Sequence, residues 1–144
     1  MNKYFIQAGL IFLIIGLFIL DKSLASVVGL LGYFSFTIIV LAFIVNIKSH
    51  RTFIFEFFIF GLLCDWHNRY LVGVGVLISV VVLYLFYVFK IRFHSNKFFM
   101  TLVNIIFVYI LALVYFGFSS IFEIRSLVLS LVSTAIISFL WLKD

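Results

Sequence analysis

Apolar residues form six long runs along the chain, and short groups of polar and charged residues separate them. The runs cover residues 4–20, 24–47, 52–66, 71–89, 98–118 and 126–142. None of them alternates apolar and polar residues with the period of two that is typical of a membrane β-barrel. A helix needs about 20 apolar residues to cross a hydrocarbon core of about 30 Å. The pattern therefore predicts an all-α integral membrane protein with about six transmembrane helices in a single domain, residues 1–144.

The composition excludes an ordinary water-soluble domain. Of the 144 residues, 67% are hydrophobic and 10% are charged, and the mean hydropathy is +1.38, whereas a soluble domain carries about 25% charged residues. The formal net charge is +5. The basic residues lie between the apolar runs, which indicates membrane topology rather than nucleic-acid binding. Cys64 is the single cysteine, so no disulfide within the chain is possible.

Lysine and arginine indicate which side of the membrane each connection occupies, because cytoplasmic loops are enriched in both. If all six runs cross, seven basic residues lie on one side and three on the other; if the third run does not cross, each side holds five. Six crossings with both termini in the cytoplasm therefore obey the rule. The richer side then holds Lys3, Lys48, Arg51, Lys90, Arg92, Lys97 and Lys143.

The predicted connections between the helices are very short. Asp21, Lys22 and Ser23 are expected to join the first two helices, and the longest turn is expected from about Lys90 to Lys97. They leave no room for a catalytic domain outside the membrane. We therefore expect the protein to act within the bilayer or at its surfaces.

Two acidic residues lie inside the third run. Glu56 follows Arg51 by about a turn and a half, or roughly 7 Å along a helix axis. This spacing favours an ion pair with Arg51 or Lys48 at the membrane surface, and a contact to another protein or to a substrate is the alternative. Asp65 precedes Arg69 by four residues, so the two can pair if the helix continues. We interpret Asp65 as part of an interfacial turn, or else as a structural or partner-binding acid.

The polar residues of the chain do not form a catalytic pattern. Asp65 and His67 are two residues apart, which points them to different sides of a helix, and the sequence has no second cluster of metal ligands. It also contains no Gly-rich phosphate loop. We therefore predict no catalytic residue, no metal and no cofactor, and expect that the protein is not an enzyme.

Small residues recur on the predicted helix faces, where they let neighbouring helices approach closely. In the sixth run, four hydroxyl residues follow one another at a spacing of four: Ser126, Ser130, Thr134 and Ser138. Similar small faces open the second and fourth runs, and they comprise Ala25, Gly29, Gly32, Gly73 and Gly75. Asn46 and Asn104 are expected to hydrogen-bond between helices. Packing inside the bundle and a seam for a partner's transmembrane helix both explain these faces.

The stretch Gly-Leu-Leu-Cys-Asp at 61–65, with Gly73 eight residues after the acid, resembles the signature of the MreD family of rod shape-determining proteins. In that family the acid ends the third membrane helix, a short periplasmic turn follows, and Leu-Gly opens the next helix. Here Leu71-Val72-Gly73 stands at that position. The family often has a glycine four residues after the acid, where this chain has Arg69. The resemblance covers about residues 53–89, and beyond them only the hydropathy matches.

The resemblance implies a six-helix bundle in the bacterial inner membrane, similar to the S-components of vitamin transporters. It implies a non-enzymatic scaffold of the cell-elongation complex, which regulates cell shape and peptidoglycan synthesis. The implied partners are an MreC-like single-span protein and, through it, an MreB-like filament and the cell-wall synthases. Membrane lipid surrounds such a bundle, and nucleic acid is not expected. Gly61, Asp65, Arg69 and Gly73 then have a structural or partner-binding role.

The likeness to S-components supplies a second hypothesis, a small-molecule-binding membrane subunit of a vitamin-type transporter. Such a subunit captures its ligand in a pocket between helices. Asp65, Trp66, His67 and Arg69 are the residues expected to line that pocket near the outer surface. Stabilisation by a vitamin would favour this hypothesis, and co-purification with an MreC-like protein would favour the scaffold.

Overall fold

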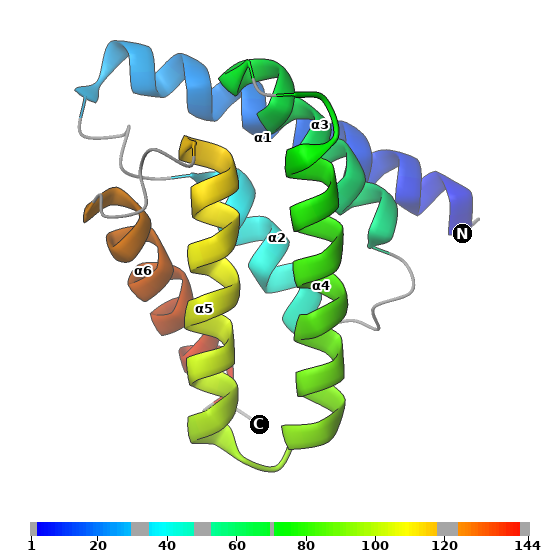
Figure 1. Cartoon of the computed structure of the whole chain (residues 1–144), viewed down its shortest axis with the longest axis vertical. Coiled ribbons are helices and arrows are strands. Elements are labelled where there is room, and N and C mark those ends of the chain that lie inside the picture. Colours follow the sequence, from blue (N-terminus) through cyan, green and yellow to red (C-terminus); the bar gives the residue numbers. More distant parts are fainter. Residues whose placement is uncertain (1–2, 30–34, 48–52, 70, 118–123, 142–144) are drawn as a thin grey trace.

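The structure is a computed structural model that describes residues 3–29, 35–47, 53–69, 71–117 and 124–141. Every regular element in these ranges is an α-helix (Figure 1), which confirms the predicted all-α class. The helices are α1 (Lys3–Val27), α2 (Phe36–Ile47), α3 (Ile54–Asn68), α4 (Val74–Phe93), α5 (Lys97–Phe116) and α6 (Ile124–Trp141).

Three of these helices, α1, α4 and α5, are long and apolar enough to cross a membrane. Helices α2 and α6 are also apolar but shorter, and α3 has 15 residues. A 15-residue helix is about 22 Å long, less than the hydrocarbon core of about 30 Å. The membrane-spanning character thus rests on three helices, and the six crossings remain a prediction.

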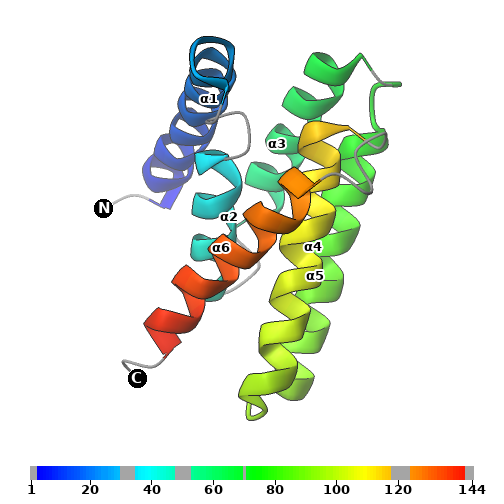
Figure 2. The same ribbon diagram turned by 90° about the vertical axis from the view of Figure 1, so that its left-hand side faces the viewer.

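Most helices pack against the next helix in the chain, and α2 and α3 are the exception. Helices α4 and α5 stand side by side as an upright hairpin, while α3 packs on α4 and α6 packs on α5 (Figures 1 and 2). Helix α1 lies obliquely to that hairpin and contacts α3 and α2. The turn between α4 and α5 lies at one end of the bundle, called here the hairpin end. The turn between α3 and α4 lies at the other end, called here the Asp65 end.

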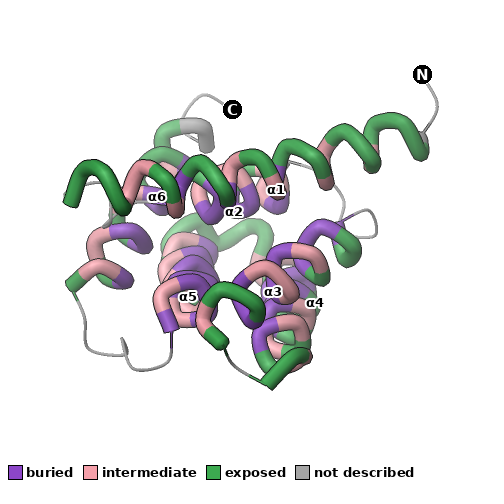
Figure 3. The backbone as a smooth tube through the Cα atoms, turned by 90° about the horizontal axis from the view of Figure 1, so that it is seen from above, coloured by how far each residue is buried: buried purple, intermediate pink, exposed green. Residues whose placement is uncertain are grey.

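Aromatic rings fill the centre of the bundle. The ring of Phe107 on α5 has its centroid 4.6 Å from that of Phe86 on α4 and 5.9 Å from that of Phe57 on α3. Figure 3 shows the buried positions of α3, α4 and α5 turned toward one another and the exposed positions turned outward. The outward positions are themselves largely apolar, as expected for helices that face lipid.

The predicted run 24–47 is wrong as a single helix. Helix α1 continues through Asp21, Lys22 and Ser23 to Val27, and α2 begins at Phe36. The predicted connection is helical because the Asp21 carboxylate is buried against the start of α2 rather than exposed in a turn. The turn predicted at 90–97 is also shorter than expected, since α4 extends to Phe93.

Gly29 does not pack inside the bundle among the described residues, whereas its alternative role, contact with a partner's helix, stays a prediction. This residue follows the end of α1 and is exposed, and a Cβ added to it would have nothing within 4 Å. Gly32 lies outside the described residues. Ala25 belongs to α1, and not to the second helix.

Candidate functional site

Asp65 joins the end of α3 to the beginning of α4. Its Oδ2 atom accepts a hydrogen bond of 2.9 Å from the backbone N–H of Gly73, and its Oδ1 atom accepts one of 2.7 Å from that of Gly75. These N–H groups belong to the start of α4, where the backbone has no intrahelical acceptor. Only 2% of Asp65 is exposed. The carboxylate therefore caps α4 from the neighbouring helix, and its charge faces the positive end of the α4 dipole.

Three glycines make this arrangement possible, each for its own reason. A Cβ on Gly61 would lie 2.5 Å from the Cα atom of Val76, so α3 and α4 touch there through their backbones. A Cβ on Gly75 would lie 2.5 Å from Oδ1 of Asp65, in the space that the carboxylate needs. Gly73 adopts a φ of +111°, which L side chains rarely tolerate.

Arg69 follows the last residue of α3 and adopts a left-handed conformation, with a φ of 57°. Its backbone N–H bonds the carbonyl oxygen of Asp65 and so closes the helix. Because α3 ends at Asn68, the condition for an ion pair between Asp65 and Arg69 is not met. A left-handed residue at a helix end is usually glycine, which is the residue that the MreD-like pattern often has at this position.

A second acid caps a helix in the same way, and the sequence analysis missed it. Asp21 on α1 accepts hydrogen bonds from the backbone N–H groups of Phe36 and Thr37, at 3.1 and 3.0 Å. It also accepts from the hydroxyls of Ser35 and Thr37, at 2.9 and 2.7 Å. The available signal was weak: an acid between two apolar runs, with Ser35 and Thr37 in the middle of the second run.

The other polar residues at the Asp65 end do not converge with Asp65. The His67 ring packs edge-on against Phe18 of α1, with centroids 6.2 Å apart, and Trp66 is 86% exposed. The side-chain amide of Asn68 donates to the carbonyls of Val114 and Tyr115 at the end of α5. The four residues proposed as a ligand pocket, 65–67 and 69, thus have different surroundings.

At the hairpin end, polar side chains again connect helices. Asn46 on α2 and Asn104 on α5 exchange side-chain hydrogen bonds of 3.1 and 3.3 Å, as expected from the sequence. The Lys90 ammonium donates to the carbonyls of Val45 and Asn46 at 3.0 and 2.9 Å. A cation at that position is favourable because the C-terminus of α2 carries a partial negative charge.

Glu56 differs from the other buried acids. It is fully buried in the first turn of α3, and neither carboxylate oxygen has a hydrogen-bond partner among the described residues. Lys48 and Arg51, its predicted partners, lie outside those residues. A buried carboxylate is costly unless it is paired, so Glu56 is a candidate functional residue.

The hydroxyl face of α6 is directed into the bundle. Ser126 and Ser130 are fully buried and Thr134 is 5% exposed, whereas Ser138 is half-buried. Ser133, which the predicted spacing left out, is also fully buried. Helix α6 contacts α5 and α2, so small side chains lie where these helices approach one another.

The arrangement can hold helices together, and within the described ranges no three His, Cys, Asp or Glu side chains gather as metal ligands. Asp21, Asp65, Lys90, Asn46 and Asn104 each link two helices by hydrogen bonds. The sequence resemblance and the geometry share Gly61, Asp65 and Gly73, and the structure adds Gly75 to them. No protein-family model, curated protein or solved structure matches the chain.

Proposed function

We propose that this chain is a non-enzymatic membrane scaffold of the bacterial cell-elongation complex, similar to MreD. In this proposal it crosses the inner membrane six times and keeps both termini in the cytoplasm. The supporting observation is the turn at the Asp65 end. Asp65 and Gly73, which carry the resemblance, are hydrogen-bonded there, and Gly61, the third such residue, lies on α3 where its backbone meets that of α4.

The way the polar groups are used also supports a scaffold. The polar side chains that link helices brace the bundle from within, and its outward positions present large apolar side chains. Association between helices in lipid depends on close packing, so such a surface suits another transmembrane helix. The proposed partner is an MreC-like single-span protein, which links the bundle to an MreB-like filament and the cell-wall synthases.

Isolation from the native cell tests this proposal. The tagged chain, extracted in a mild detergent, should retain an MreC-like single-span protein, and its depletion should turn rod-shaped cells round. As a control, the tagged Gly16→Ala chain should behave like the wild type in both measurements, because nothing lies within 4 Å of a Cβ at that position. Unchanged cell shape after depletion, with no MreC-like protein retained, would contradict the scaffold. Thermal stabilisation by a vitamin under those conditions would favour the transporter subunit.

Cysteine labelling tests the proposed topology separately. In a Cys64→Ser background, single cysteines are introduced at Ser95, in the turn between α4 and α5, and at Trp66, near the end of α3. Both positions are exposed. An impermeant thiol reagent should label Trp66→Cys from outside the cell and Ser95→Cys only after the membrane is opened. The reverse result, or labelling of both from one side, would overturn the six-crossing arrangement.

A further inference from the structure

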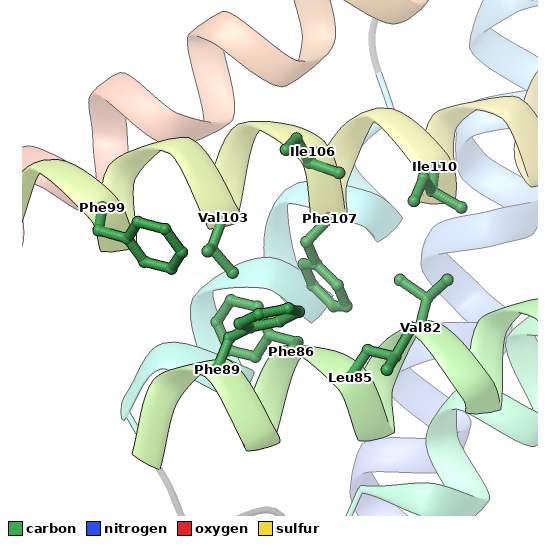
Figure 4. A pocket seen from close by; sticks show the side chains of 9 residues that line it. All are labelled: Val82, Leu85, Phe86, Phe89, Phe99, Val103, Ile106, Phe107 and Ile110. Carbon is green, nitrogen blue, oxygen red and sulfur yellow. The ribbon is translucent and has the colours of Figure 1, made fainter. Parts of the chain in front are cut away.

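An apolar groove runs between α4 and α5 on the outside of the bundle (Figure 4). Its volume is about 190 Å³. Its floor is formed by buried side chains, among them Phe86 and Phe107, and its rims by exposed ones such as Leu85 and Ile106. A partner helix is 10–12 Å across, so the groove is too small to hold one, whereas a hydrocarbon chain is thin enough to enter.

Three phenylalanine rings, Phe89, Phe93 and Phe99, lie at the end of the groove nearest the hairpin end. The ring of Phe99, which lines the groove, lies 4.1 Å from that of Phe93 and 6.2 Å from that of Phe89, measured between centroids. The guanidinium of Arg92 lies 5.8 Å from the Phe93 ring centroid. A cation therefore lies beside the aromatic cluster at this end of the groove.

That tip is basic and has no acid of its own. Arg92, His94 and Lys97 are exposed there, whereas the Lys90 ammonium is held by the carbonyls of α2. The sequence contains no Asp or Glu between Asp65 and Glu123, so neither α4, α5 nor the turn between them supplies a counter-ion. A guanidinium beside the end of a hydrocarbon-lined groove, with a second cation, Lys97, at the same tip of the hairpin, matches the two halves of an acidic lipid.

We propose that this hairpin binds one anionic phospholipid, with its phosphate at Arg92 and Lys97 and one acyl chain in the groove between α4 and α5. Arg92 lies three residues after Phe89, so it continues the face of α4 that lines the groove. Clusters of Lys and Arg beside a membrane helix attract acidic lipid headgroups. Binding in the groove also requires that the ligand has an apolar chain. A diffuse electrostatic attraction to the membrane surface has no such requirement.

The test measures lipids that stay bound to the purified full-length chain. The protein, in mild detergent, is mixed with equal amounts of phosphatidylglycerol and phosphatidylcholine of identical acyl chains, and adducts are counted by native mass spectrometry. The wild type should retain phosphatidylglycerol preferentially. Arg92→Gln and Lys97→Gln should each weaken that preference by about fivefold, the effect of one surface charge. The control Arg69→Gln, which removes one charge at the opposite end, should leave it unchanged.

A second pair of variants tests the groove itself. Val103→Phe fills it, whereas Leu102→Phe introduces the same ring at an exposed position outside it. Only Val103→Phe should reduce retention of phosphatidylglycerol. Equal effects of the three charge variants, or no effect of Val103→Phe, would overturn the proposal. The proposal would also be overturned if the wild type formed a dimer and Val103→Phe dissociated it, because a second copy of the chain would then occupy the groove. None of these outcomes bears on the scaffold proposal, because no other protein is present.

Discussion

The Oδ1 atom of Asp65 lies 2.7 Å from the backbone nitrogen of Gly75, so the acid at the end of one helix caps the beginning of the next. Ordinarily a side chain just before a helix performs this function. Here the capping group comes from the neighbouring helix, and the cap is at the same time a tertiary contact. A change at Asp65 therefore affects both the start of α4 and its packing against α3.

Replacing Asp65 should destabilise the protein in proportion to the acceptors lost. Asp65→Asn keeps one acceptor and should cost about 1–3 kcal/mol, because one buried N–H loses its partner, and Asp65→Ala should cost more. Thermal unfolding in detergent, followed by circular dichroism, measures both. Trp66→Phe is the control at an exposed neighbour. An Asp65→Ala protein that melts like the wild type would contradict the capping role.

Gly61→Ala should be destabilising by about 1–3 kcal/mol, since the added methyl group meets the Val76 backbone and forces the helices apart. Gly16→Ala makes the same chemical change at an exposed position where the methyl group meets no neighbour, and it should be neutral or stabilising because alanine favours helix. The two unfolding midpoints, compared in one detergent, give the result. Equal midpoints would show that α3 and α4 do not touch at Gly61.

Asp21 and Thr37 should be energetically coupled. The Thr37 hydroxyl donates to Oδ2 of Asp21 at 2.7 Å, so Thr37→Val removes this hydrogen bond, and Asp21→Asn, which keeps one of the two acceptor oxygens, weakens it. In a double-mutant cycle the coupling should be about 0.5–3 kcal/mol. Ser23→Ala, which alters an exposed hydroxyl on α1, should add independently to Asp21→Asn. A coupling near zero would mean that Asp21 does not bind the start of α2.

Glu56 should behave in the opposite way to Asp65. Glu56→Leu removes a buried acid that has no hydrogen-bond partner in the described part of the chain, and it should raise the unfolding midpoint. Asp65→Leu, on the same helix, should lower it. If Glu56→Leu is more stable and yet fails to restore cell shape in depleted cells, the acid is kept for function. A lower midpoint would show that Glu56 has a stabilising partner.

Arg69→Gly should leave stability unchanged or raise it by up to about 1 kcal/mol, because glycine adopts the left-handed conformation without the steric cost that a side chain pays. Arg69→Val should be destabilising, since a branched side chain fits that conformation poorly. The same melting experiment ranks the three proteins. A strongly destabilised Arg69→Gly would show that the guanidinium itself holds the turn.

The sequence predicted helices well because each apolar run has its own local signal. It also identified Gly61, Asp65 and Gly73, whose spacing lies within one helix–turn–helix unit. It could not predict the partners of Asp21, because the donors lie 14 to 16 residues further along and only packing brings them together. The break between α1 and α2 was misplaced for the same reason. Charge alone did not distinguish a residue in a turn from a buried cap.

Glu56 shows a second limit of sequence-based reasoning. Its distance from Arg51 predicted an ion pair at the membrane surface, but helix periodicity does not tell which face of α3 is covered by neighbouring helices. Burial of that face depends on how α3 packs in the bundle. The contact of Lys90 with the end of α2 could not be predicted either. Lys90 lies 45 and 44 positions after the two residues whose carbonyls it binds, so only packing brings them together.

The two capping acids have a consequence for how the chain enters the membrane. Each acid and the backbone groups that it binds belong to consecutive helices, α1 with α2 and α3 with α4. In lipid no water is available to solvate a carboxylate or a free N–H group. Each of these two pairs can therefore satisfy its own capping carboxylate as soon as both helices are synthesised. The two helical pairs can thus form separately, before the final bundle assembles.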